Sequence, residues 1–301
     1  MNQTQYQILL YYKYVPIADP DSFASEHRDL CNEIGLKGRI IVSREGINGT
    51  VSGTTEQTSA YIKAMHADAR FADMPFKIDS YHAHAFKKLK VKVKSELVHL
   101  KLEEDINPNQ LTGKRLTPQE FMEQVEQGDV VILDGRNNYE YDLGHFRNAI
   151  RPDVSTFREF PEWIRENRAL FEDKKVLTYC TGGIRCEKLS GLLIREGFED
   201  VFQLDGGIVT YGKDPQARGQ HFDGKCYVFD ERIGVPINQV EQTVVGLCHH
   251  CGQAADKYMN CAYPQCHKQH LVCPSCEEQF AGYCSEQCQT THHEKLESNL
   301  H

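Results

Sequence analysis

The segment that most constrains this chain runs from Cys180 to Cys186 and reads Cys-Thr-Gly-Gly-Ile-Arg-Cys. It follows a short apolar run, Val176–Tyr179, of the kind found in strands buried within parallel sheets. Two glycines permit a tight loop after Cys180, and a helical pattern begins near Arg185. This order predicts α/β architecture with Cys180 at the carboxyl end of a strand, where such sheets place their binding sites.

Cys180 has the expected surroundings of a reactive cysteine. The loop amides and the N-terminus of the following helix place partial positive charge around its sulfur, which favours the nucleophilic thiolate. Arg185 adds a permanent cation five positions later. We therefore expect an ionised sulfur in a cup of main-chain donors that opens toward a substrate. The alternative is a small residue placed at a tight turn.

The length of the loop separates two kinds of cysteine chemistry. Cys180 and Arg185 have the spacing C-x4-R, which gives a compact loop matched to a single sulfur atom. Cysteine phosphatases use C-x5-R to enclose a phosphate, and Cys186 occupies that position here. The spacing therefore favours sulfur chemistry over phosphate ester hydrolysis. Cys186 is either a resolving thiol or a packed bystander.

The first hundred residues predict an α+β domain. Residues 1–105 read as a βαββαβ succession, which is typical of a ferredoxin-like fold. The expected elements are a strand from Ile8 to Tyr14, a helix over about 20–34 ended by Gly35, a hairpin at Asn48-Gly49, a helix over 56–67, and a final strand or pair within 76–100.

Residues 106–218 predict the parallel-sheet domain. Thr117, Pro118 and Glu120 form a helix start with a capping box, and Gly128 suits the end of that helix. Three short apolar runs predict buried strands, at 130–133, 176–179 and 201–204.

Residues 219–301 predict a small metal-binding domain. Eight of the twelve cysteines form four close pairs there: Cys248 with Cys251, Cys261 with Cys266, Cys273 with Cys276, and Cys284 with Cys288. Two pairs make one tetrahedral thiolate site, so eight ligands fit two structural zinc ions. Alternating pairing, first with third and second with fourth, would cross-brace the segment, and consecutive pairing is the other possibility. A disulfide framework is the alternative to metal.

The charge distribution is compatible with a nucleic-acid partner, although the net charge is negative. The net charge is −9, but residues 1–105 contain 14 Lys/Arg and 14 Asp/Glu, so the excess acid lies in the rest of the chain. Four lysines alternate with apolar residues and therefore share one face of a predicted strand: Lys88, Lys90, Lys92 and Lys94. They could contact RNA phosphates. A solvated edge strand protected by charge is the alternative.

Composition also bears on location and cofactors. The chain has no run of about 18 apolar residues, so we expect no membrane span. Residues 1–5 lack the basic start and apolar core of a secretion signal, and we expect a cytoplasmic protein whose thiols serve metal binding or catalysis. No G-x-G-x-x-G motif for a flavin or nicotinamide is present, and nothing points to a protein partner.

Further motifs resemble the rhodanese superfamily. They are Asp134-Gly135-Arg136, Glu140-Tyr141, Gly144-His145-Phe146 with Ala149, and the stretch from Gly197-Phe198 to Leu204-Asp205-Gly206-Gly207. Of these residues, Asp134, Arg136 and His145 are expected to brace the fold. The wider layout, with Ser43–Gly49 in the front domain and the cysteine-rich tail, resembles the bacterial tRNA uridine(34) hydroxylase family over nearly the whole chain.

That resemblance implies an oxygen-dependent conversion of the wobble uridine of tRNA to 5-hydroxyuridine. The anticodon region of tRNA would be the substrate and molecular oxygen the co-substrate. Cys180 would be the nucleophile, through a persulfide or by attack on C6 of the uracil, and Arg185 would hold negative charge. The remaining loop residues would contact the substrate: Thr181, Gly182, Gly183 and Ile184.

Two other functions stay open. The loop alone favours a sulfurtransferase that forms a persulfide from thiosulfate or a related donor. A zinc-containing adaptor with an inactive rhodanese domain is the third possibility, and the intact Cys180 and Arg185 argue against it.

Overall fold

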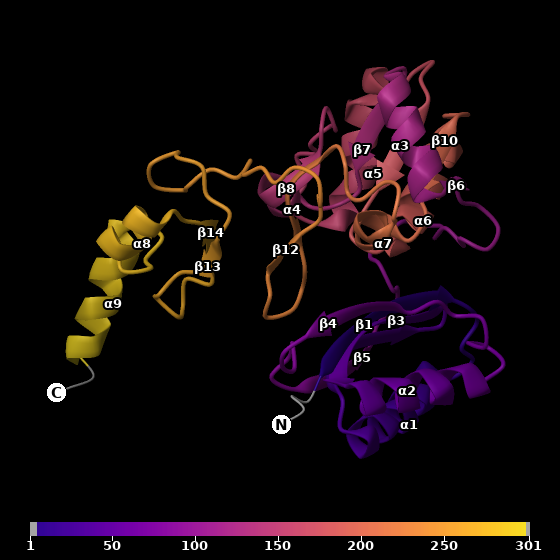
Figure 1. The fold of residues 1–301 in the computed structure, drawn as a ribbon, viewed down its shortest axis with the longest axis horizontal. Helices are drawn as coiled ribbons and strands as arrows, with labels where there is room; N and C mark the ends of the chain where they lie inside the picture. The colour runs from indigo at the N-terminus through magenta and orange to yellow at the C-terminus, as the bar shows by residue number, and fades with distance from the viewer. Residues whose placement is uncertain (1–4, 299–301) are drawn as a thin grey trace.

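The computed structural model describes residues 5–298 and has three parts that follow one another along the chain (Figure 1). An N-terminal sheet with two helices on its outer face lies against the central domain. The cysteine-rich tail extends to one side of both. Among the described residues, no helix has the length and apolar character needed to cross a membrane.

The N-terminal part is the predicted ferredoxin-like domain with one strand added. Its elements are β1 (Tyr6–Tyr14), α1 (Pro20–Ile34), β2 (Lys37–Ser43), β3 (Gly46–Thr54), α2 (Thr55–Ala67), β4 (Lys77–Tyr81) and β5 (Leu89–Val93). The sheet order is β4-β1-β3-β2-β5, in which β5 runs parallel to β2 and the other neighbours are antiparallel. Both helices cover the same face of this sheet, so its other face is free to meet the central domain (Figure 1).

Local sequence sets the helix ends and the core of this domain. The Asp19 side chain accepts a hydrogen bond from the Ser22 amide at the start of α1, and Gly35 ends the helix with a φ of 87°. Alternate residues of the strands, such as Leu9, Ile40 and Val91, are buried beneath the helices. The intervening residues therefore face the opposite side of the sheet.

The predicted hairpin turn at Asn48-Gly49 is wrong. The chain turns at Arg44-Glu45, between β2 and β3, and Asn48 and Gly49 lie within β3. Gly49 pairs with Tyr11, and a Cβ at position 49 would overlap the Tyr11 side chain. Gly49 is therefore needed because the Tyr11 ring packs directly against its backbone. Short-range sequence signals cannot distinguish a glycine in such a contact from a glycine in a turn.

The central part is the predicted parallel-sheet domain. Its strands and helices are β6 (Lys114–Leu116), α3 (Pro118–Gln127), β7 (Val131–Asp134), α4 (Asn138–Leu143), β8 (Gly144–Phe146), α5 (Phe160–Glu166), β9 (Val176–Tyr179), α6 (Ile184–Arg195), β10 (Val201–Leu204) and α7 (Gly207–Lys213), with short 3₁₀ turns at Phe157–Glu159 and Arg168–Leu170. The parallel sheet has the order β6-β10-β9-β7. The Thr117–Glu120 capping box is present as predicted.

The tail begins as an extension of the central domain. Its elements are β11 (Phe222–Tyr227), β12 (Gly234–Pro236), β13 (Tyr258–Asn260), β14 (Gln269–Leu271), α8 (Pro274–Gln279) and α9 (Glu286–Ser298). Strand β11 pairs with both β8 and β12, whereas β13 and β14 form a separate hairpin among the cysteines.

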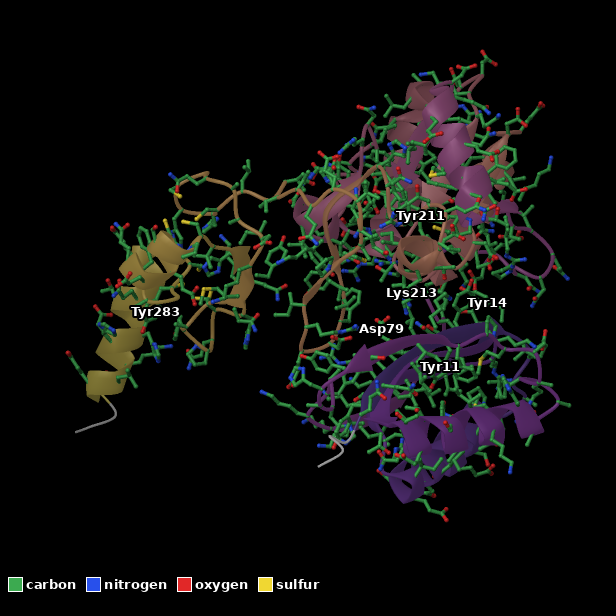
Figure 2. The ribbon with its side chains drawn as sticks, viewed as in Figure 1. Tyr11, Tyr14, Asp79, Tyr211, Lys213 and Tyr283 are labelled. Carbon is green, nitrogen blue, oxygen red and sulfur yellow. The ribbon has the colours of Figure 1, made fainter. Side chains whose placement is uncertain are left out.

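Ion pairs join the helix-free face of the N-terminal sheet to the central domain. Figure 2 shows Asp79 of β4 and Lys213 of α7 between the two domains, and these side chains form an ion pair. Asp79 also binds Arg232 of the tail, with 2.7 Å between Oδ2 and Nη1. One carboxylate therefore holds all three parts together.

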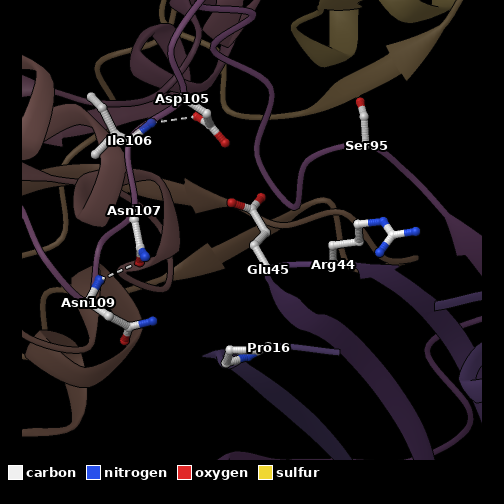
Figure 3. Close-up of a pocket in the computed structure, with 8 residues that line it drawn as sticks. All are labelled: Pro16, Arg44, Glu45, Ser95, Asp105, Ile106, Asn107 and Asn109. Carbon is white, nitrogen blue, oxygen red and sulfur yellow. Dashed lines mark hydrogen bonds between the residues drawn. The ribbon is translucent and has the colours of Figure 1, made fainter. Parts of the chain in front are cut away.

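A second junction is built on Lys188 of α6, whose side chain is fully buried. Its Nζ lies 2.9 Å from Glu45 Oε2, 3.3 Å from Glu96 Oε2 and 2.6 Å from Asp105 Oδ2. Glu45 and Asp105 also line a pocket of about 330 Å³ between the β2–β3 turn and the linker to the central domain (Figure 3). This pocket is lined by no cysteine.

Candidate active site

Cys180 lies directly after β9, and the start of α6 holds its sulfur. The Gly183 amide donates a hydrogen bond to Cys180 Sγ at 3.1 Å. Gly183 has a φ of 100°, so glycine is required at this corner. The N-terminus of α7 fixes the same loop, because the Ile208 amide donates to the Cys180 carbonyl at 3.0 Å. The expected arrangement of strand, cysteine, loop and helix is present.

The loop favours the thiolate of Cys180. Burial alone would raise the pKa of this thiol, but the Cys186 thiol, the Arg185 guanidinium and the amides of Cys186 and Gly183 together lower it to about 6. For Cys186, burial and the neighbouring Cys180 raise the pKa well above its usual range. At neutral pH one sulfur is therefore ionised, and the other is a thiol that can donate to it.

Arg185 is tied to a buried carboxylate. Its Nη1 lies 2.6 Å from Glu140 Oε2, and its Nη2 lies 2.8 Å from Glu140 Oε1. Nη2 also donates to Thr181 Oγ1 at 3.2 Å. Burial would raise the pKa of the Glu140 carboxyl, but Arg185, together with Arg136 and the Asn137 amide, lowers it. Arg185 therefore fixes the loop through Thr181 while sharing its charge with Glu140.

The cup around Cys180 opens onto the N-terminal domain. Cys180 is only 1% exposed. A Cβ on Gly182 would lie 2.9 Å from Leu10 Cδ2, and one on Gly183 would lie 3.0 Å from the Tyr12 hydroxyl. The predicted opening toward a substrate is wrong for this structure, because Leu10 and Tyr12 of β1 close it. The loop pattern gave no sign of this cover, because it comes from a strand 170 positions earlier in the chain.

Tyr12 and Lys77 are the residues at this site that the sequence motifs missed. The Tyr12 hydroxyl donates to Glu187 Oε1 at 3.0 Å, which attaches β1 to α6. Lys77 Nζ lies 5.2 Å from the centroid of the Tyr12 ring. Burial lowers the pKa of Lys77, whereas nearby Cys180 raises it. The available signal is the continuous apolar and aromatic run of β1 from Ile8 to Tyr12, which indicates a strand covered on both faces.

Other rhodanese-like motif residues brace the central domain, as expected. Asp134 and Arg136 form a buried ion pair, with 2.6 Å between Oδ2 and Nη2, and the Tyr179 hydroxyl donates to the same carboxylate at 2.6 Å. The His145 ring stacks on Tyr141 with a centroid separation of 3.8 Å. Asp134 of β7 pairs with Tyr179 of β9, so this ion pair lies beside the end of the strand that leads to Cys180.

The four lysines of the lysine edge (Lys88, Lys90, Lys92 and Lys94) are all exposed. They lie on or beside β5, which is the outer strand of the N-terminal sheet. Lys88 and Lys90 also line a groove of about 500 Å³, together with Arg39, Tyr227 and Phe229. Lysines from the first domain thus face aromatic rings from the tail.

The eight tail cysteines gather into two groups of four. Cys248, Cys251, Cys273 and Cys276 form one group, and Cys261, Cys266, Cys284 and Cys288 form the other. Pairs therefore alternate, first with third and second with fourth. Within each group the sulfurs lie within 4.8 Å of one another.

The sulfur spacings fit tetrahedral metal sites. The Sγ atoms of Cys251 and Cys273 are 3.7 Å apart, and those of Cys266 and Cys284 are 3.6 Å apart. These distances match the edge of a tetrahedron with zinc–sulfur bonds of about 2.3 Å, and they far exceed a disulfide bond of about 2.05 Å. Both groups could hold a metal ion, with zinc the ion that four thiolates suit best.

Known proteins resemble the chain over almost its full length. Three family models match it: the UPF0176 acylphosphatase like domain over residues 6–97, the rhodanese-like domain over 117–214, and the model described as Rhodanase C-terminal over 223–289. A tRNA uridine(34) hydroxylase of Bacillus pumilus is 57% identical over 289 residues, covering 96% of this chain and 90% of that protein. The chain belongs to the tRNA uridine(34) hydroxylase family.

Further members of the tRNA uridine(34) hydroxylase family show the same extent of similarity. The Staphylococcus epidermidis protein of that name is 59% identical over 94% of this chain and 88% of its own length. The Bacillus velezensis protein is 56% identical over 96% of this chain and 89% of its own length. Both cysteine groups of this family member lie within residues 223–289, the stretch that the C-terminal family model matches.

Proposed function

We propose that this protein is a tRNA uridine(34) hydroxylase that converts the wobble uridine of tRNA to 5-hydroxyuridine in an oxygen-dependent reaction. Membership of a family with that name supports the substrate and the product. The observation that carries the mechanism is the lowered pKa of Cys180, about 6, in a loop whose Gly183 amide points at the sulfur. A cytoplasmic location stays a prediction.

We assign Cys180 as the nucleophile. Addition of its thiolate to C6 of the uracil forms an Sγ–C6 bond and moves the C5–C6 electron pair toward C5 and O4. C5 is then electron-rich and attacks the terminal oxygen of a hydroperoxide, which forms the C5–O bond, breaks the O–O bond and releases the other oxygen as water or an alcohol. The hydroperoxide is molecular oxygen reduced by two electrons from an external donor. Loss of the C5 proton together with expulsion of the thiolate restores the C5–C6 double bond. Arg185 positions the loop, and the amides of Gly182 and Gly183 stabilise negative charge near it.

Other residues have proposed supporting roles. Thr181 and Ile184 border the substrate, and the lysine edge contacts RNA phosphates. The two cysteine groups hold structural zinc ions, because four thiolate ligands leave no open position for a substrate. The proposed domain boundaries are residues 1–105, 106–218 and 219–301.

A sulfurtransferase is the second candidate. The compact loop and the ionised Cys180 would equally suit a persulfide formed from thiosulfate. A thiosulfate–cyanide assay tests it directly, and turnover that depends on Cys180 would favour this alternative.

Nucleoside analysis tests the hydroxylase. A strain that lacks the gene is complemented with wild type, Cys180→Ser or Cys31→Ala, and 5-hydroxyuridine in its tRNA is measured by mass spectrometry. Cys31 is a matched control, because it is a buried thiol whose pKa is raised to about 12 by burial and it lies in the N-terminal core. Wild type and Cys31→Ala should restore the nucleoside, and Cys180→Ser should not. Restoration by Cys180→Ser would remove the nucleophile assignment.

A further inference from the structure

One row of paired residues crosses the whole N-terminal sheet and joins the lysine edge to the Cys180 loop. Its members, in order across the five strands, are Lys90, Arg39, Thr50, Leu10 and Lys77. Directly paired residues on neighbouring strands point to the same face of a sheet. The row therefore forms a continuous line of side chains, about 19 Å long at about 4.8 Å per strand spacing.

This row lies on the face without helices. Its sequence neighbours Ile40, Val91 and Leu9 are buried on the other side, under α1 and α2. At the inner end, Leu10 contacts the Cys180 loop at Gly182. At the outer end, Arg39 and Lys90 are exposed and line the groove that the tail completes.

The side chains along the row suit an unpaired nucleic-acid strand. Arg39, Lys90 and Lys77 make no ion pair with any residue between 5 and 298. Arg39 and Lys90 are exposed, so their charges are available to phosphates, whereas Lys77 is partly buried and reaches a base oxygen only after β1 and β4 move off the loop. Aromatic faces stand beside them: Tyr12 under Lys77, and Phe229, which is 46% exposed, across the groove. Cations next to aromatic rings on a sheet face are the means by which sheet-based modules bind single-stranded RNA, and here only the outer end of the row is uncovered.

We propose that the helix-free face of the N-terminal sheet is the track for a single-stranded RNA segment. Phosphates bind Lys90 and Arg39 at the outer end, and the target base enters between Lys77, Tyr12 and Cys180. This proposal rests on the proposed function for the identity of the RNA. Because Leu10 and Tyr12 cover the loop, entry of the base requires this part of the sheet to move off Gly182 and Gly183. A double-stranded RNA is too wide to reach a covered thiol in this way.

Binding measurements test the outer end of the track. The probes are an anticodon stem-loop RNA and a fully paired hairpin of equal length, and affinity is followed by fluorescence anisotropy at several salt concentrations. Arg39→Glu should weaken stem-loop binding about tenfold and reduce the magnitude of the salt slope by about one. The matched control is Lys63→Glu, an exposed lysine on α2 at the opposite face, which should stay within about twofold of wild type. Equal losses in the two variants, or equal wild-type affinity for both RNAs, would overturn the track.

The inner end is tested by separating binding from modification. Lys77→Met should keep stem-loop affinity within about threefold but lower 5-hydroxyuridine formation at least about tenfold, and Lys77→Arg should recover part of it. Two outcomes separate the track from the proposed function. If wild type makes 5-hydroxyuridine and the Arg39 and Lys77 variants equal it in RNA affinity and in product, the track is rejected and the proposed function is kept. If wild type makes no 5-hydroxyuridine but Arg39→Glu still weakens RNA binding, the proposed function is rejected and the track is kept.

Discussion

Arg185 and Glu140 form a two-bonded ion pair directly beside the cysteine loop. The two nitrogen–oxygen distances are 2.6 and 2.8 Å, and the Glu140 side chain is completely buried. A buried cation and its carboxylate stabilise a fold only while both are present, because removal of one leaves the other charged without a partner. The reactive loop is thus tied to α4 through an interaction that a single substitution breaks.

Glu140→Gln is expected to lower the free energy of unfolding by about 3–5 kcal/mol, because the buried Arg185 charge loses its partner. Urea denaturation measures this. Glu172→Gln is the control, since Glu172 pairs with Arg168 at an exposed position and should change stability by no more than about 1 kcal/mol. Equal losses of unfolding free energy in Glu140→Gln and Glu172→Gln would show that the Arg185–Glu140 pair does not stabilise the loop.

The reactivity of Cys180 should depend on pH with a midpoint near 6. The thiolate is the reactive form, and the surroundings of Cys180 lower its pKa to about 6. Alkylation takes place only in molecules in which β1 has moved off the loop, since Cys180 is 1% exposed, and its rate should rise through pH 6 and level off above about pH 7. Peptide mass spectrometry after iodoacetamide treatment gives the rate at each pH. A midpoint at the usual value of a free cysteine, about 8.5, would contradict the lowered pKa.

Arg185→Met should move the same midpoint upward by at least about one pH unit. The substitution removes the Arg185 cation, whose charge lowers the pKa of Cys180, so its loss disfavours the thiolate. The alkylation profile of Cys180 measures the shift. An unchanged midpoint would mean that loop amides and Cys186 alone hold the thiolate.

Cysteine substitutions in the tail should release metal according to the alternating pairs. Cys248→Ser combined with Cys273→Ser removes ligands from a single group and should cost about one zinc ion per chain. Cys248→Ser combined with Cys261→Ser removes one ligand from each group and should cost about two. Metal analysis of the purified proteins measures the zinc content of both double variants. A loss of two zinc ions in the first variant and one in the second would support consecutive pairing.

Lys188→Met should loosen the junction between the first two domains. Three carboxylates, Glu45, Glu96 and Asp105, would then face one another without their shared cation, and we expect a loss of about 3 kcal/mol in unfolding free energy. Thermal and urea unfolding measure the loss. Lys174→Met, at an exposed position, is the control and should be nearly neutral.

Charge reversal at the lysine edge should weaken tRNA binding. Lys90→Glu together with Lys92→Glu should lower affinity at least about tenfold and reduce its salt dependence, because two phosphate contacts become repulsive. Lys63→Glu together with Lys174→Glu carries the same change in net charge at other exposed positions. If both double variants bind tRNA equally well, the lysine edge is only a solvated outer strand.

Local patterns predicted the features that depend on neighbours in sequence. The caps at Thr117 and Gly128 and the buried strand before Cys180 follow from rules that act over a few residues, and the structure has them. Asn48-Gly49 shows the limit of such rules. The same dipeptide suits a turn or a close approach of strands, and the position of Tyr11 selects the second.

The sequence by itself determined the loop that ionises Cys180 and the thiols that suit two metal sites, because their chemistry depends on short spacings along the chain. Only the tertiary structure decided which cysteine pairs come together and which residues cover the reactive sulfur. Leu10, Tyr12 and Lys77 reach Cys180 through strand register and domain packing. Such contacts join residues far apart in sequence, and no local pattern encodes them.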